Sequence, residues 1–305
     1  MKVHFAGLEL ANPIIAASGT FGYGIEFEEI VALEQIGAFV TKGLSIEPMA
    51  GTKPPRMVPT AAGMLNAIGL QNIGVDEFIL KKLPELRRYP ACKVIANVFG
   101  YRVADYLAVV ERLNDADGVA AYELNVSCPN VHEGGMAFGA DAGALEHLVA
   151  RIKAITRRPV IVKLSPNVTS IAQMAKVAAL AGADALSLVN TFLAMAIDAE
   201  TRQPLLHNVT GGLSGPAIKP IALRMVYEAA QAVRIPILGM GGIGSAEDAV
   251  EFLLAGATAV QVGTASYADP RATEKLVKQL ERWCRNHNVQ KVSSLTGALT
   301  IPWRQ

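Results

Sequence analysis

The sequence predicts a single (β/α)8 barrel, and two observations lead to this fold class. Eight short apolar runs, each of strand length, alternate along the chain with segments of helical character. This alternation is typical of a parallel sheet, and eight repeats in one chain favour a closed barrel over its rival, an open doubly wound sheet. A chain of 305 residues, 51% of them hydrophobic, has an ordinary length for such a barrel. We therefore assign residues 1–305 to one TIM-barrel domain.

The elements follow in a regular order. The chain begins with a predicted hairpin over residues 3–10, which turns near Ala6 and Gly7. We expect barrel strands over residues 14–17, 38–41, 93–97, 118–124, 159–163, 185–189, 235–238 and 259–262. We expect helices over residues 26–36, 75–86, 104–113, 143–155, 171–181, 216–232, 246–255 and 274–284. Gly37 and Gly182 stand where two of these helices should end, since glycine readily adopts the backbone conformation that closes a helix.

Two connections are much longer than the others. Residues 45–72 follow the second strand and residues 192–215 follow the sixth, at matching places in the two halves of the barrel. The first insertion carries four prolines between residues 48 and 59, so we expect neither helix nor regular strand there. Loops of this length inside a compact domain are usually functional. We expect both insertions to lie over the same mouth of the barrel as lids.

Composition excludes several classes of protein. Lys and Arg number 28 against 27 Asp and Glu, so no basic field points to nucleic acid or to a membrane surface. No signal peptide and no apolar stretch long enough for a transmembrane helix is recognisable. The three cysteines, Cys92, Cys128 and Cys284, are far apart and form no CxxC pair. The chain therefore cannot build a zinc or iron–sulfur site in the usual way, and a cytoplasmic location is expected.

Polar groups and glycines stand at the carboxyl ends of the predicted strands, where barrels hold their active sites. These residues are Ser18, Lys42, Asn97, Asn125, Lys163, Asn190, Gly241 and Gly263. The set contains no carboxylate, so it suits a flat anionic or carbonyl-rich ligand and no metal is expected. Neither lysine has a carboxylate at its own strand end, which argues against plain salt bridges. A Schiff base on Lys163, as in barrel aldolases, is an alternative role.

The fourth strand ends in a stretch that concentrates polar groups. Asn125, Ser127 and Cys128 follow an apolar run, and Pro129 should stop the strand because it cannot donate a backbone hydrogen bond. A glycine-bearing loop comes next, with His132 as the nearest base. Two interpretations remain open from these residues alone: a site that uses the thiol, or a buried cysteine at a strand end.

A glycine run follows the seventh strand. Residues 239–244 formally match GxGxxG, but the match comes too late in the chain for a dinucleotide-binding fingerprint. In barrels, a phosphate site is commonly built from glycine amides after strands seven and eight. Gly241, Gly242, Gly263 and Thr264 fit such a site, and a simple tight turn is the alternative.

At these residues the sequence closely resembles the dihydroorotate dehydrogenase family. The shared segments are residues 17–22, 41–43, 66–72, 97–100, 125–130, 163–166, 190–191, 212–217, 239–243 and 263–264. They stand in the family's order and extend over nearly the whole chain. The resemblance implies a flavoprotein oxidoreductase with one FMN per chain across the carboxyl mouth of the barrel. The implied reaction is the oxidation of (S)-dihydroorotate to orotate in de novo pyrimidine biosynthesis, which leads to UMP.

The resemblance also implies roles for individual residues. The implied cofactor-binding residues are Ser18, Lys42, Gly43, Asn97, Asn125, Lys163, Val189, Gly215, Gly241, Gly242, Gly263 and Thr264. The implied substrate-binding residues are Lys42, Asn66, Ala67, Ile68, Gly69, Leu70, Asn125, Asn190 and Thr191. Cys128 matches the family's base, which removes a proton from C5 while a hydride leaves C6 for FMN. Lys163 is the candidate to stabilise negative charge on the reduced flavin.

Softer similarities concern the class within the family. The membrane-bound class has Ser in place of Cys128 and an N-terminal membrane segment, so this chain resembles the soluble class 1. Residues 134–139 and 218–225 resemble the NAD-dependent subclass, class 1B. That subclass pairs a catalytic homodimer with electron-transfer subunits that carry FAD and a [2Fe-2S] cluster, giving a heterotetramer. The small number of cysteines agrees with a cluster held only by the partner.

Three alternatives remain open beside this function. One is the fumarate-dependent class 1A of the same family. The second is another pyrimidine-ring flavin reductase, of the dihydropyrimidine dehydrogenase or dihydrouridine synthase type; the near-neutral charge argues against a tRNA substrate. The third is a catalytically silent scaffold subunit, which would contain no FMN.

Overall fold

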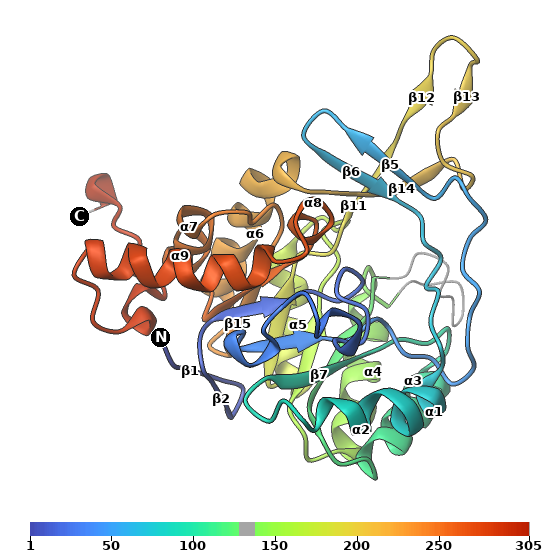
Figure 1. Cartoon of the computed structure of the whole chain (residues 1–305), viewed down its shortest axis with the longest axis horizontal. Coiled ribbons are helices and arrows are strands. Elements are labelled where there is room, and N and C mark those ends of the chain that lie inside the picture. The colour runs from blue at the N-terminus through green and yellow to red at the C-terminus, as the bar shows by residue number, and fades with distance from the viewer. Residues whose placement is uncertain (128–137, 305) are drawn as a thin grey trace.

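The predicted barrel is present in the computed structural model, which describes residues 1–127 and 138–304 (Figure 1). Its strands are β3 (Ile14–Ala16), β4 (Ala38–Val40), β7 (Lys93–Val98), β8 (Val119–Asn125), β9 (Val160–Lys163), β10 (Ala185–Leu188), β15 (Ile237–Met240) and β16 (Ala259–Val262). They pair in parallel and close in the order β10-β15-β16-β3-β4-β7-β8-β9. Closure excludes the doubly wound alternative, in which the sheet would have two edges.

The barrel strands are buried on both faces. Every residue of β4, β9, β10, β15 and β16 is buried, as expected for strands that face the barrel interior on one side and helices on the other. Register places polar residues of neighbouring strands opposite one another. Asn97 of β7 pairs with Glu123 of β8, and Asn125 of β8 pairs with Lys163 of β9. Because side chains alternate between the two faces of a strand, Glu123 and Asn125 point to the same side.

Helices cover the outside of the barrel (Figure 1). The helices and helical turns after the second barrel strand are α1 (Val75–Glu77), η3 (Phe78–Lys82), α2 (Leu83–Leu86), α3 (Val103–Asn114), α4 (Ala142–Ile155), α5 (Ile171–Leu180), η4 (Pro216–Ile218), α6 (Lys219–Ala232), α7 (Ala246–Leu254), α8 (Ala265–Ala268), α9 (Ala272–Asn286), η5 (Val292–Leu295) and η6 (Pro302–Arg304). Several begin at side-chain caps: Asp141, Ser170 and Ser245 each accept a hydrogen bond from the backbone amide three residues later. The predicted helix over residues 75–86 is present, with a π-helical turn at its centre.

The prediction of a helix over residues 26–36 is wrong. The structure has two 3-10 turns there instead, η1 (Ile25–Phe27) and η2 (Leu33–Gln35). Ala32 between them has an extended backbone, with φ −71° and ψ 90°. The buried side chains on either side, Val31 and Leu33, are two residues apart, a spacing that a helix would place on different faces.

The two long insertions form one antiparallel sheet, which we call the lid sheet. Its strands are β5 (Met57–Thr60), β6 (Gly63–Asn66), β11 (Phe192–Met195) and β14 (Thr210–Ser214), in the order β11-β14-β6-β5. The expectation of no regular strand over residues 45–72 is therefore wrong. Pro59 is tolerated because β5 is an edge strand, where a missing amide proton breaks no ladder. The expectation that both insertions lie over one mouth is confirmed (Figure 1).

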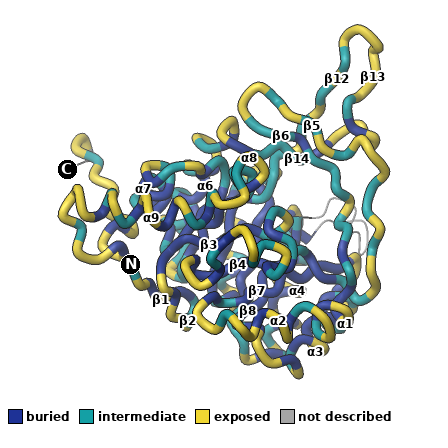
Figure 2. The backbone as a smooth tube through the Cα atoms, viewed as in Figure 1, coloured by how far each residue is buried: buried dark blue, intermediate teal, exposed yellow. Residues whose placement is uncertain are grey.

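Two hairpins complete the chain. The predicted N-terminal hairpin, β1 (Val3–Phe5) with β2 (Leu8–Leu10), turns at Ala6 and Gly7, which both have positive φ. A second hairpin, β12 (Ile197–Asp198) with β13 (Gln203–Pro204), projects from the lid sheet away from the barrel (Figure 1). Figure 2 shows the contrast in burial between the dark blue barrel strands and the largely exposed projecting hairpin. No helix in the described part of the chain is long and apolar enough to cross a membrane.

Candidate functional site

One large cavity lies between the carboxyl ends of the barrel strands and the lid sheet. Its volume is about 1560 Å³. Every predicted cofactor- or substrate-binding residue lines it, namely Ser18, Lys42, Gly43, Asn66, Ala67, Ile68, Gly69, Leu70, Asn97, Asn125, Lys163, Val189, Asn190, Thr191, Gly215, Gly241, Gly242, Gly263 and Thr264. These residues come from all eight strand ends and from both insertions. The fold thus brings together residues that the chain separates by up to 246 positions, between Ser18 and Thr264.

The predicted base does not belong to this described set. Cys128 and residues 129–137, with His132 and most of the loop 134–139, lie outside the described residues. Ser127, directly before Cys128, lines the cavity, and so does Gly139 beyond the gap. The role assigned to Cys128 therefore stays a prediction.

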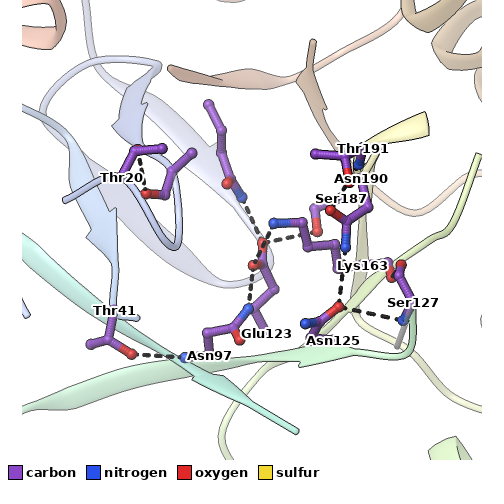
Figure 3. Close-up of polar contacts among 12 residues, drawn as sticks. Thr20, Thr41, Asn97, Glu123, Asn125, Ser127, Lys163, Ser187, Asn190 and Thr191 are labelled. Carbon is purple, nitrogen blue, oxygen red and sulfur yellow. Dashed lines mark hydrogen bonds and ion pairs between the residues drawn. The ribbon is translucent and has the colours of Figure 1, made fainter. Parts of the chain in front are cut away.

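A buried carboxylate, which was not predicted from the sequence, lies beneath the cavity. Glu123 of β8 has no exposed surface, and its Oε1 lies 3.7 Å from the Lys163 Nζ (Figure 3). Oε1 also accepts a hydrogen bond from the Asn97 amide at 2.8 Å. Oε2 accepts from the Ser187 hydroxyl at 2.9 Å and from the Gln261 amide at 2.6 Å. We call Asn97, Glu123, Lys163, Ser187 and Gln261 the floor cluster.

The expectation that no carboxylate lies near the strand-end residues is therefore wrong. Lys163 does have an acidic partner, Glu123. Glu123 lies two residues before Asn125, the last residue of β8. The sequence signal was a glutamate inside an otherwise apolar strand, two residues before Asn125 and hence on the same face. A charge in such a strand is rarely buried without a partner. Ser187 and Gln261, polar residues inside apolar strands, carry the same signal.

Lys42 at the end of β4 differs from Lys163. Its side chain is half-buried, and no carboxylate of the described residues forms an ion pair with it. Burial, with a smaller contribution from the nearby positive charge of Arg56, lowers the pKa of the Lys42 ammonium below its usual value. An unpaired cation in a cavity wall is suited to an anionic ligand.

Amides line the side of the cavity near β8 and β10. The Asn125 Oδ1 accepts from the Asn190 amide at 3.2 Å and from the Ser127 backbone at 3.3 Å (Figure 3). The Asn190 Oδ1 accepts from the Thr191 backbone at 2.8 Å. Because these bonds occupy the Asn125 oxygen, its NH₂ group remains to donate to a ligand.

The predicted phosphate site is a backbone cradle. Gly215, Gly241 and Gly242 all have positive φ, and a Cβ on Gly242 would lie 2.8 Å from the Gly215 oxygen. The backbone of the turn therefore requires glycine at these positions, in agreement with the alternative of a simple tight turn. The backbone amides of Gly242, Gly263 and Thr264 donate to no acceptor within residues 1–127 and 138–304. Free amides converging beside a cavity suit an anion, so the turn and the phosphate site are compatible.

The described residues contain no cluster of three or more His, Cys, Asp or Glu side chains that could hold a metal ion. The chemistry available in the cavity is instead that of two lysines, several carboxamides and backbone amides. Two buried oxygens near it, the Gln261 Oε1 and the Ser214 Oγ, have no partner among the described residues. Because both residues line the cavity, a ligand with hydrogen-bonding groups could satisfy these two atoms.

The whole chain was compared with known proteins and protein families. A family model described as dihydroorotate dehydrogenase matches residues 1–283. The catalytic subunit of dihydroorotate dehydrogenase B (NAD(+)) from Geobacter sp. strain M21 is 55% identical over 301 residues, which cover 99% of this chain and 98% of that protein. The same subunit from Trichlorobacter lovleyi is 56% identical over 299 residues, 98% of each chain. A protein described as putative dihydroorotate dehydrogenase A (fumarate), from Solibacter usitatus, is 55% identical over 293 residues, 96% of each chain.

Proposed function

The chain belongs to the dihydroorotate dehydrogenase family, and we propose that it is the catalytic subunit of an NAD-dependent enzyme that oxidises (S)-dihydroorotate to orotate. The observation that carries the proposal is the single cavity that contains every described residue assigned to cofactor or substrate. Its lysines and carboxamides complement a cyclic, carbonyl-rich anion, which describes both the substrate and its product.

FMN is the cofactor that we propose for the cavity. The free amides of Gly242, Gly263 and Thr264 would hold its phosphate, and Asn97, Lys163 and Gln261 would contact its ring. The unpartnered Gln261 Oε1 supports this fit, because a ring N–H would satisfy it. When bound, FMN would supply the redox chemistry by accepting the hydride from the substrate.

The chain's own residues would bind and activate the substrate. Lys42 would pair with its carboxylate, and Asn125, Asn190 and Thr191 would orient its ring through hydrogen bonds. The substrate contacts from residues 66–70 would come from the end of β6 and the segment after it, so the lid sheet would exclude water from the bound ring. Cys128 would take the C5 proton as a thiolate, since a thiol with an ordinary pKa of about 8.5 is readily deprotonated in a positively charged site.

Electrons would leave through a partner. The relatives from Geobacter and Trichlorobacter are described as catalytic subunits, which supports a second subunit for this chain. We propose that the partner carries FAD and a [2Fe-2S] cluster and binds a catalytic homodimer. The Solibacter relative favours a second candidate, in which fumarate is the electron acceptor.

The test begins with the chain purified alone and with its partner from the same source. Dihydroorotate should bleach the flavin absorbance of both preparations, and NADH should form only with the partner present. Turnover of the isolated chain with fumarate would replace the NAD assignment by the second candidate. A flavin that dihydroorotate does not reduce would overturn the proposed reaction.

Cys128→Ala tests the base separately. In rapid mixing, the variant should keep FMN but lose flavin reduction by dihydroorotate by a factor of about 100 or more. A reduction rate near that of the wild-type chain would remove Cys128 from the mechanism and leave the reaction itself untouched.

A further inference from the structure

The floor cluster has an unusual composition of donors and acceptors. The carboxylate of Glu123 is completely buried and is surrounded only by donors: two carboxamide NH₂ groups, one hydroxyl and one ammonium group. A carboxylate accepts hydrogen bonds and donates none. Each neighbour is therefore forced to turn a donor toward Glu123, whatever else lies in the cavity.

This constraint determines what the two carboxamides present elsewhere. Asn97 and Gln261 each use the NH₂ group on Glu123, so each has its carbonyl oxygen left for another partner. The Gln261 Oε1 is buried without a described partner. The Asn97 Oδ1 lies toward Gly43, where a Cβ would approach it to 3.2 Å, and Gly43 lines the cavity. Both side chains are 1% exposed, so neither can turn over freely into solvent.

We propose that Glu123 is a positioning residue: its carboxylate orients Asn97 and Gln261 as hydrogen-bond acceptors and holds the Lys163 ammonium beside them. The floor of the cavity then selects a ring edge that offers an N–H donor next to a carbonyl oxygen. This inference rests on the proposed function, in which the pyrimidine edge of a flavin has that pattern. Glu123 itself does not line the cavity, so it acts through its three neighbours.

A neutral residue of the same shape cannot perform this role. In Glu123→Gln, the new NH₂ group would face one of the four groups that donate to Glu123, so two donors would oppose each other. We expect a neighbouring carboxamide to rotate by half a turn so that its oxygen accepts from the new NH₂ group. That carboxamide would then present NH₂ to the cavity, and a ring N–H would meet a donor. The substitution keeps size and burial, so its effect on binding reports the donor and acceptor pattern rather than packing.

The experiment compares FMN with N3-methyl-FMN, which lacks the ring N–H, by flavin fluorescence titration of the flavin-free chain. The wild-type chain should bind FMN about tenfold or more tightly than the methylated analogue. Glu123→Gln should weaken FMN binding about tenfold and bring the ratio between the two flavins close to one. Gln261→Met, which keeps Glu123, should also lower the ratio, and it provides the test if Glu123→Gln does not fold.

Tyr122→Phe is the matched control. Tyr122 is the adjacent residue of β8, buried on the opposite face, and its hydroxyl bonds to Asn114 and Arg158. This variant should lower the melting temperature but leave the flavin ratio at the wild-type value. A Glu123→Gln chain with the wild-type FMN affinity and ratio overturns the inference while the proposed function stands. A wild-type chain that binds no FMN overturns the proposed function, and the inference with it.

Discussion

The floor cluster and the lid sheet border the same cavity but are held together by different forces. The floor cluster joins side chains from five barrel strands around one buried charge, and three of these side chains line the cavity. The lid sheet is joined mainly by its backbone ladder, and most of its side chains are half-buried or exposed. A substitution in the floor should therefore affect the whole fold, whereas one in the lid should stay local.

The largest effect is expected for Glu123→Ala. Removing one partner of a buried pair leaves the Lys163 charge uncompensated, which costs about 3–5 kcal/mol of unfolding free energy. Urea unfolding of the flavin-free chain measures it. Glu146→Ala, which removes an exposed glutamate from α4, should change stability by less than about 0.5 kcal/mol. Equal stability of the two variants would show that the floor is no more cooperative than the surface.

A smaller effect is expected at the glycine cradle. In Gly242→Ala, the methyl group would lie 2.8 Å from the Gly215 oxygen in a backbone with φ +77°, a strain of about 1–3 kcal/mol. FMN affinity should fall as the amides shift. Gly143→Ala, at an exposed position of α4 outside the cavity lining, is the control, because its Cβ meets nothing closer than 3.4 Å and its φ is not positive. Isothermal titration with FMN distinguishes the two variants, and equal losses in both would refute the role of the cradle.

A lid substitution should change substrate binding alone. Asn66→Ala removes the 3.3 Å hydrogen bond from Asn66 Nδ2 to the Gly212 oxygen, which joins the two insertions. Because Asn66 is also a proposed substrate contact, the variant should lose about 1 kcal/mol of substrate binding, so KM for dihydroorotate should rise about fivefold while the FMN dissociation constant stays unchanged. Gln203→Ala, in the exposed hairpin of the same insertion as Gly212, should alter neither constant. A parallel loss of FMN affinity in Asn66→Ala would show that floor and lid are coupled.

The smallest effect concerns pH and Lys42, a cavity residue that belongs neither to the floor cluster nor to the lid sheet. Burial and then the charge of Arg56 lower the pKa of Lys42, so the folded chain loses this proton at a lower pH than the unfolded chain. Between the two pKa values the unfolded state binds more protons, so this group makes unfolding free energy rise with pH. KM for dihydroorotate should rise in the same window, because the neutral amine no longer attracts a carboxylate. Lys42→Gln should remove this rise, and a KM profile unchanged by the substitution would contradict the assignment.

Most of the site was predictable from sequence because its residues stand next to local signals. Lys42, Asn97 and Gly263 each follow an apolar run, and the barrel's topology gathers all strand ends at one mouth. The errors were also local. In the sequence alone, Pro59 is evidence against a strand. It lies in an edge strand, where proline is tolerated, and the sequence does not show which strands become edges. Residues 26–36 were predicted to form one helix, but contacts that hold this segment come from distant parts of the chain, such as the hydrogen bond from the Ala32 amide to Glu274.

The alternation of strands and helices, the matching insertions and the polar strand ends all depend on neighbours in sequence, so the amino-acid order was enough to assign barrel, mouth and family. The floor cluster required the tertiary structure. Glu123 has its partners 26, 64 and 138 residues away, and nothing along the chain says that Asn97, Ser187 and Gln261 meet it. Barrel closure alone creates that meeting, because it brings β16 round to face β8 across the interior.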